Sequence, residues 1–442
     1  MLACKLVTQC ILQDICICVS YSQGKDGNSC FGSEPSYCQF GTKTDYNTAI
    51  MPYLNETTVP LSVPAGCKPT LFYLFQRHTI RYPSAKDIHR AQERLPEIQE
   101  KLRSTCRKSK MCKTDIDAIL SWKDPFDLEK ENTVTDTGKQ AVRDQVARLK
   151  QRFPSVFANR RGLKNVIVDF SSKGSRTKHT AESFLREWFG DKKYETSIAK
   201  RLKVVNPLNM FHEECEAIMK EHGVNSTSAN EEILLNSKIF KKFKDTIERR
   251  LSFDVRKQDI KAMLTQCRFE VAAYGKSPWC ALFGENEFRF TELLDDVEDY
   301  DTDAYGSPRN TMVACRVAID LLNHTRNITQ AELKLPRVVL HFSHAGAFKK
   351  LSTLLNLANS STPAQNCTNR AWFSSRQSPF NANLNVVYFT CPKGQENRVA
   401  FLLNEKLEQL PCCNEPLCTV DEVEGILGPK ADACDLNAIC SK

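Results

Sequence analysis

Several features that mark common protein classes are missing from this chain of 442 residues. No two cysteines stand in C-x-x-C spacing, which argues against a structural zinc site. Beyond the N-terminus there is no uninterrupted run of about 18 apolar residues, so we expect no internal membrane span. Repeats, low-complexity tracts and motifs that mix aromatic with basic residues are absent too, so the formal net charge of +8 does not indicate a nucleic-acid partner. The composition, 41% hydrophobic and 26% charged, is that of an ordinary globular protein with one large core or two coupled ones.

Cysteine, in contrast, is abundant. The 20 cysteines are many for a reduced cytosolic enzyme, and we interpret them mainly as disulfides formed in an oxidising compartment. Six N-x-S/T sequons also favour a glycosylated protein of the secretory pathway. They start at Asn55, Asn225, Asn323, Asn327, Asn359 and Asn366. No retention tetrapeptide closes the chain, which leaves open the endoplasmic reticulum lumen, the cell surface or secretion.

The N-terminus, residues 1–22, resembles a weak signal peptide. Lys5 precedes an apolar stretch, but Gln9, Gln13 and Asp14 interrupt it. After this leader we expect an α/β core made of residues 23–84, 132–190 and 304–410. Residues 85–131 and 191–303 show helical patterns without a strand rhythm, so they are predicted to be helical cap insertions. Residues 411–442 form a Cys-rich tail that we expect to be held by disulfides rather than packed.

The most informative segment is Leu71–Pro83. An apolar strand predicted over Thr70–Gln76 ends abruptly in Arg77, His78 and, shortly after, Arg81. Ligands bind at the C-terminal ends of strands in open α/β sheets. Arginine offers permanently charged donors that suit a phosphoryl group, and histidine can act as nucleophile or acid near neutral pH. The alternative is a strand end whose charges are simply solvated.

Two later predicted strands also lead into basic or histidine side chains. The run Asn165–Phe170 is followed by a polar loop that contains Arg176 and then by a predicted helix. The run Arg337–His344 ends in His344 and is again followed by a helix. The N-termini of such helices favour anions. We therefore predict a site for one tetrahedral phosphate, held by charge-assisted hydrogen bonds without a metal. Its residues are Arg77, His78, Arg81, Arg176 and His344.

Two charged regions of the cap insertion allow more than one interpretation. The acidic run from Glu292 to Asp299 is interpreted as a solvated helix end rather than a metal site, because its spacing fits no metal-binding motif. Basic residues also gather in the cap, at positions that could face a polyanion. They are Lys200, Arg201, Lys203, Lys238, Lys241, Lys242 and Lys244.

The segment Arg77–Pro83 resembles the RHGxRxP signature of the histidine acid phosphatases, and the whole chain is similar to the multiple inositol polyphosphate phosphatases. The ordered blocks that carry this resemblance are Phe40–Thr44, Thr135–Lys139, Arg152–Phe157, Ser171–Phe184, Asp299–Gly306 and Val399–Lys406. It implies a phosphoglycerate mutase-like core sheet flanked by helices, with an inserted, mostly helical cap.

The resemblance also implies residue roles. His78 would be the nucleophile, and Arg77, Arg81, Arg176 and His344 the phosphate ligands. The implied substrates are small polyphosphates: phytate, other inositol polyphosphates and 2,3-bisphosphoglycerate. No cofactor and no metal are implied, and the basic residues of the cap would meet the phosphates that do not react.

Two departures from the family pattern stand out. The family has Gly where this chain has Thr79, so a β-branched side chain stands where the backbone passes close to phosphate. The family's His-Ala-Glu is here His344-Ala345-Gly346, and the missing glutamate is the family's proton donor. General acid catalysis contributes about 10²–10⁴-fold, so turnover of an alkyl phosphate should suffer more than binding.

Two functions therefore remain open. The first is an active phosphomonoesterase, slower than its relatives or using another carboxylic acid from the cap. The second is a binding protein that keeps the polyphosphate site and has lost most of its chemistry. His341 is expected to be a structural core histidine, and the other histidines receive no role. They are His89, His179, His212, His222 and His324.

Overall fold

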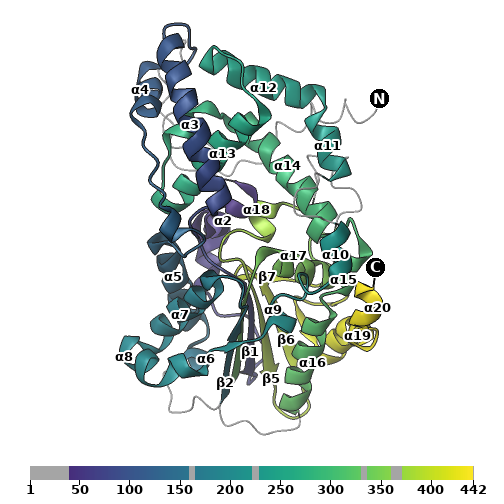
Figure 1. Cartoon of the computed structure of the whole chain (residues 1–442). Coiled ribbons are helices and arrows are strands. Elements are labelled where there is room, and N and C mark those ends of the chain that lie inside the picture. Colours follow the sequence, from purple (N-terminus) through teal and green to yellow (C-terminus); the bar gives the residue numbers. More distant parts are fainter. Residues whose placement is uncertain (1–38, 159–164, 222–227, 330–335, 360–370, 442) are drawn as a thin grey trace.

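A mixed eight-stranded sheet lies at the centre of the computed structural model, which describes residues 39–158, 165–221, 228–329, 336–359 and 371–441 (Figure 1). The strand order is β3-β2-β4-β1-β5-β6-β7, and β8 pairs with β6. Pairing is parallel from β3 to β1 and antiparallel from β1 to β7. The strands are β1 Lys68–Arg77, β2 Val166–Phe170, β3 Lys203–Val204, β4 Arg337–Ser343, β5 Asn383–Thr390, β6 Arg398–Leu403, β7 Lys406–Glu408 and β8 Leu417–Thr419.

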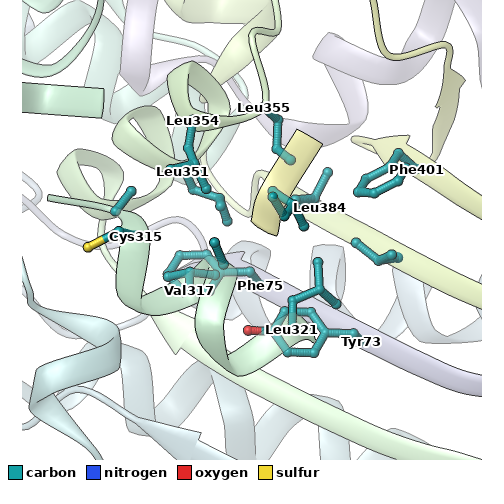
Figure 2. Close-up of a cluster of buried hydrophobic side chains, with 14 of the residues drawn as sticks. Tyr73, Phe75, Cys315, Val317, Leu321, Leu351, Leu354, Leu355, Leu384 and Phe401 are labelled. Atoms are coloured by element: carbon teal, nitrogen blue, oxygen red, sulfur yellow. The ribbon is translucent and has the colours of Figure 1, made fainter. Parts of the chain in front are cut away.

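Both faces of β1 are buried, which explains its nearly continuous apolar run. Phe72 and Leu74 point to one face, where α5, α6 and α7 pack. Tyr73 and Phe75 point to the other face and contact α16 and α17, as Figure 2 shows with Leu321 among their neighbours. The helices on these two faces are α5 Asp136–Arg152, α6 Pro154–Phe157, α7 Ser175–Phe189, α16 Cys315–Thr329, α17 Ala345–Leu354 and α19 Val420–Asp432.

A second cluster of buried apolar side chains lies in a helical region at the top of Figure 1, beyond the C-terminal ends of β1, β2 and β4. Leu95, Ile247, Met263 and Phe288 come from four different helices and meet there. Helix α3 continues through Pro96 without a break. The helices of this region are α3 Ala85–Thr105, α4 Lys113–Ser121, α11 Ala229–Leu235, α12 Lys238–Leu251, α13 Lys257–Tyr274 and α14 Glu285–Asp303.

Short elements complete the described chain. The short α-helices are α2 Tyr46–Ile50, α8 Asp191–Lys193, α9 Asn206–Asn209, α10 Glu216–Glu221, α15 Pro308–Met312, α18 Ser374–Gln377 and α20 Leu436–Cys440. The 3₁₀ segments are η2 Gly41–Lys43, η3 Met51–Thr58, η4 Leu128–Lys130, η7 Ala199–Arg201 and η8 Pro278–Leu282, and η6 Tyr194–Ile198 is a π-helical turn.

The segment 191–218 packs against the sheet, although the sequence assigns it to the cap. Tyr194 and Ile198 join the apolar layer of α7, while Leu208 and Phe211 join the layer on the opposite face. Strand β3 also lies in this segment and extends the sheet. The cap boundary drawn at residue 191 is therefore too early. The sequence pattern did not reveal it because β3 has only two residues.

The C-terminal tail is packed as well as cross-linked, so the expectation of a tail without packing is wrong. Val423 and Leu427 are four residues apart on α19 and are buried in the core. Disulfides also tie the tail down. They join Cys413 with Cys418, Cys315 with Cys434, and Cys215 with Cys440.

Further disulfides join Cys67 with Cys391 and Cys267 with Cys280, so the predicted use of cysteine is confirmed. This chemistry fits an oxidising compartment of the secretory pathway. Four sequon asparagines are exposed, and the other two lie outside the described residues, as does the predicted signal peptide. The exposed ones are Asn55, Asn323, Asn327 and Asn359. Within the described ranges, no helix has the length and apolar character needed to cross a membrane.

Candidate active site

Three strand ends bring the predicted phosphate-site residues together. Parallel pairing aligns Arg77, the last residue of β1, with Ser343 of β4, and the backbone N–H of His78 donates to the Ser343 carbonyl at 2.9 Å. His344 follows as the N-cap residue of α17. Arg176 lies in the first turn of α7, which begins at Ser175. We call Arg77, His78, Arg81, Arg176 and His344 the basic cluster.

His78 is 4% exposed, and its tautomer can be derived from one contact. Its Nδ1 lies 2.9 Å from the carbonyl oxygen of Thr79. A carbonyl only accepts, so Nδ1 carries the hydrogen and Nε2 keeps its lone pair. Burial, with Arg77 and Arg176 nearby, holds the pKa of His78 well below its usual value. The imidazole is therefore neutral and able to act as a nucleophile at Nε2.

The three arginines of the cluster have no carboxylate within ion-pairing distance among the described residues. Arg77 donates from Nη1 to the carbonyls of Thr42 at 2.6 Å and Ser378 at 2.7 Å, and its guanidinium carbon lies 4.7 Å from the centroid of the Phe380 ring. Arg81 donates to the Tyr82 carbonyl at 2.9 Å.

Burial lowers the pKa of all three guanidinium groups, and repulsion by neighbouring arginines lowers it further for Arg77 and Arg81. The pKa falls to about 9 for Arg77 and to about 10 for Arg81, and it is also lowered for Arg176. The Nε atoms of Arg77 and Arg176 are buried and, within the described chain, without a hydrogen-bond partner. Buried donors without partners are costly, so this arrangement favours a bound anion.

His344 is the other histidine of the cluster, with its ring centroid 5.5 Å from that of His78. Its Nε2 lies 2.6 Å from the hydroxyl oxygen of Ser171, and its buried Nδ1 has no partner in the described part of the chain. Burial, followed by the charge of Arg176, lowers the pKa of His344 to about 2. The ring is neutral and presents one free nitrogen.

Thr79 does not obstruct this site, although its β-branched side chain replaces the family's glycine. Its hydroxyl donates to the Gly138 carbonyl at 2.9 Å, and its backbone N–H donates to the Thr180 hydroxyl at 3.1 Å. The side chain is therefore directed toward the start of α5. A Cβ at Gly138 would lie 2.5 Å from the Ile80 carbonyl, so only glycine allows this close approach.

Most of the acidic run of α14 is buried rather than solvated, so that interpretation is wrong for Glu292, Asp296 and Asp299, whereas Glu298 is exposed. Asp299 and Asp303 each lie 2.5 Å from the Nζ atom of Lys349, and Asp303 also contacts Lys350. Glu292 contacts Ser375 and is fully buried. The partners come from α17 and α18, far away in sequence, which is why the acidic run alone looked like a surface feature.

The basic residues of the cap do not surround the cluster as expected. Helix α12, which carries Lys238, Lys241, Lys242 and Lys244, lies at the far end of the helical region from the strand ends (Figure 1). The group Lys200–Lys203 lies at or beside the exposed edge strand β3. The nearer cation is Lys173, which lowers the pKa of His344 by its charge and pairs with Glu213 at 2.6 Å.

The remaining histidines separate into different environments. His341 is a core histidine: its Nδ1 lies 2.6 Å from Asp169 and its Nε2 3.2 Å from Asp320. His89 is exposed, His179 and His324 are half-buried, and His222 lies outside the described residues. His212 is buried directly beside Gly346, a proximity that sequence analysis missed because no motif relates the two positions.

A surface cavity of about 660 Å³ lies elsewhere, and no member of the basic cluster lines it. Its walls carry both signs of charge, including Asp136, Lys139, Glu182 and Arg186. Such a lining does not favour a polyanion. Among the described residues, no group of three or more His, Cys, Asp or Glu side chains could hold a metal ion.

Comparison with known proteins gives consistent matches over most of the chain. A family model described as histidine phosphatase superfamily (branch 2) matches residues 73–404. Multiple inositol polyphosphate phosphatase 1 of Drosophila melanogaster is 26% identical over 419 residues, which cover 89% of this chain and 86% of that protein.

Solved structures show the same fold. The phytase from D. castellii superimposes with a TM-score of 0.68 at 16% identity, covering 92% of this chain and 86% of its own. The multiple inositol polyphosphate phosphatase of Bifidobacterium longum, in complex with inositol hexasulfate, gives a TM-score of 0.61 at 14% identity, covering 89% and 98%.

Proposed function

Because the chain belongs to the histidine phosphatase superfamily (branch 2), we propose that it is a phosphomonoesterase that hydrolyses inositol polyphosphates through a phosphohistidine at His78. One observation carries the proposal. A neutral histidine with a free Nε2 stands among three arginines, one buried and two half-buried, that have no carboxylate partner in the described chain. A phosphoryl group supplies the missing negative charge and a phosphorus atom for attack.

The reaction has two displacement steps. In the first, Nε2 of His78 attacks phosphorus, the P–N bond forms, and the bond to the leaving oxygen breaks. In the second, water attacks the phosphohistidine, the P–N bond breaks, and its electron pair returns to Nε2. Arg77, Arg81 and Arg176 stabilise the charge on the non-bridging oxygens in both steps, so a metal ion is not required.

The substrate class rests on the relatives. The fly relative is a multiple inositol polyphosphate phosphatase, and a structural neighbour is a phytase. Phytate is therefore the first substrate to test, with 2,3-bisphosphoglycerate as the second. The disulfides and the exposed sequon asparagines support action in the secretory pathway.

Substitution His78→Ala tests the proposal. Phosphate release from phytate should fall by about 10⁴-fold or more, because the covalent step is lost. Acid quenching of the wild type with radiolabelled substrate should trap a phosphoenzyme that the variant does not form. The control is His89→Ala, an exposed histidine on α3, which should behave as wild type.

Binding separates this function from that of a non-catalytic homologue. The His78→Ala variant should still bind inositol hexakissulfate, because its arginines remain. A wild-type protein that binds this compound but hydrolyses no phosphate ester would establish the binding-protein alternative. Retained turnover in His78→Ala would exclude the phosphohistidine route.

A further inference from the structure

Gly346 leaves room that a histidine from another segment fills. A Cβ atom at this position would lie 2.8 Å from Cδ2 and 2.9 Å from Nε2 of His212. Contacts under about 3.0 Å force one partner to move, so a side chain at 346 and the His212 ring in its present place exclude each other. The residue missing from the His344-Ala345-Gly346 turn is thus replaced in space by an imidazole.

The segment that carries His212 is firmly held. Ser343 donates from its hydroxyl to the Asn209 carbonyl at 2.5 Å, and the Asn209 side chain donates to Asp169 at 2.7 Å. Phe211 is buried in the core beside the sheet, and Cys215 is bonded to Cys440. These contacts fix the imidazole against the first turn of α17, next to His344.

The His212 ring has a free polar atom at this place. Its Nδ1 is buried and has no hydrogen-bond partner among the described residues, and Nε2 is 3.7 Å from Glu213. His212 is near enough to His344 to lower its pKa, and the ring centroid of His344 lies 5.5 Å from that of His78. His212 is therefore close to a phosphate bound by His344 without being one of the arginine ligands.

We propose that His212 is the general acid of this enzyme and protonates the leaving oxygen of an inositol phosphate. The inference rests on the proposed function and adds a residue to it. In the first step, the P–O bond breaks, its electron pair goes to the leaving oxygen, and the imidazolium of His212 gives that oxygen its proton. In the second step, neutral His212 takes the proton of the attacking water, which restores the imidazolium and frees phosphate.

Two carboxylic acids of the helical region compete for this role. Asp303 lies closest, 3.2 Å from the same Cβ position, but Lys349 and Lys350 outweigh its burial and hold its pKa below the usual value. Each of its two carboxylate oxygens is held by a lysine, Oδ2 by Lys349 and Oδ1 by Lys350, so neither oxygen is free to carry a proton to a substrate. Glu298 is exposed, and the charges that act on its carboxyl group belong to Asp299, Asp295, Lys43 and Glu231, none of which lies on α17.

The charge balance at His212 predicts an acidic pH optimum. Burial, followed by the charge of Lys350, lowers the pKa of His212 to about 3. A bound phosphate group adds negative charge and raises that pKa, so the proton is held in the substrate complex. The charged or titratable groups that face the ring are Lys173, Glu213, Asp303, His344, Lys349 and Lys350.

The test compares leaving groups. In His212→Ala and in the larger His212→Gln, kcat should fall by about 10²-fold or more for phytate and for glycerol 2-phosphate, with KM little changed. For p-nitrophenyl phosphate, whose leaving group needs little protonation, kcat should fall by less than about 10-fold. The acid limb of the phytate pH profile should also shift. Hydrolysis of p-nitrophenyl phosphate in the same sample shows that the variant is folded.

Gly346 provides a second test that leaves His212 in place. Gly346→Glu alone should not raise phytate turnover, because its Cβ collides with His212, whereas Gly346→Glu combined with His212→Ala should recover turnover relative to His212→Ala. Glu298→Gln should keep the wild-type leaving-group pattern. Loss of phytate turnover in Glu298→Gln, or an equal loss for both leaving groups in the His212 variants, would overturn the inference.

Failure of the proposed function looks different. A wild type that turns over glycerol 2-phosphate but not phytate contradicts the substrate class only, and the His212 comparison is then read on glycerol 2-phosphate. A wild type that turns over phytate with no loss in His212→Ala contradicts only the role of His212. A wild type that cleaves aryl phosphates alone has no working acid, which contradicts both.

Discussion

His341 and His344 lie three residues apart at the end of β4, and both are buried, but their surroundings differ. Burial acts to lower the pKa of His341. The carboxylates of Asp169 and Asp320 act in the opposite direction and outweigh burial, so the pKa is raised to about 9. For His344, burial and the charge of Arg176 act together and lower the pKa to about 2. The first histidine is satisfied by the protein, whereas the second is left with a free nitrogen.

The cations of α17 and of the basic cluster repeat this contrast. Lys349 pairs with Asp299 and Asp303, which outweigh its burial and raise its pKa. Arg77 is buried and Arg176 is half-buried, and neither has such a partner within the described residues. Charges paired inside the protein hold the structure together, whereas buried charges without partners require a ligand.

Among the paired charges, the substitution Lys349→Met should have the largest effect on stability. Asp299 and Asp303 would lose a buried partner, and removal of one member of a buried ion pair costs about 3–5 kcal/mol in unfolding free energy. Urea unfolding with the disulfides intact measures the change. The control is Lys113→Met, which removes an exposed pair with Asp117 and should leave the urea unfolding midpoint unchanged. Equal, small losses would show that burial does not distinguish the two pairs.

Substitution of an arginine without a carboxylate partner should have the opposite effect, a loss of activity without a loss of stability. Arg176→Ala should lower kcat/KM by about 10²–10³-fold, because a charge that stabilises the transferred phosphoryl group is lost. It should not lower the melting temperature, since the removed charge has no carboxylate partner in the described structure. Arg186→Ala on the same helix, where Asp191 lies 3.0 Å away, is the matched control and should keep full activity. A clear loss of stability in Arg176→Ala would mean that this arginine is structural.

The side chains of the basic cluster could be predicted from the sequence more readily than the ion pairs of Lys349. Arg77 and His78 directly follow a strand whose apolar run is visible in the chain, and parallel strands bring their C-terminal ends to one edge of a sheet. Lys349 and Asp299 are 50 positions apart. They lie on two different helices, and nothing in the sequence pattern of either helix indicates that the two make contact. A run of acidic residues looks the same whether its partners are water or lysines across a helix contact.

His212 illustrates the same limit at the site itself. Its place beside Gly346 depends on the contacts of Asn209 and Phe211 with the sheet, and none of these follows from spacing along the chain. The absent side chain at 346 was visible in the sequence, but the ring that fills its place was not. A missing motif residue is therefore a reason to search for a neighbour in space before activity is doubted.

The smallest expected effect concerns His341 and is a dependence of stability on pH. The pKa of His341 is about 9 in the folded protein and about 6.5 when unfolded, so the folded state binds more protons between these values. The stabilisation by its carboxylate partners is fully present below about pH 6.5 and is lost as the pH rises through about 9, by about 3 kcal/mol in total. Unfolding midpoints in urea, measured from pH 6 to pH 9.5 with disulfides intact, should fall in the wild type and in the control His89→Ala. In His341→Gln this component of the decline should vanish, and a decline as steep as that of the wild type would assign it to other groups.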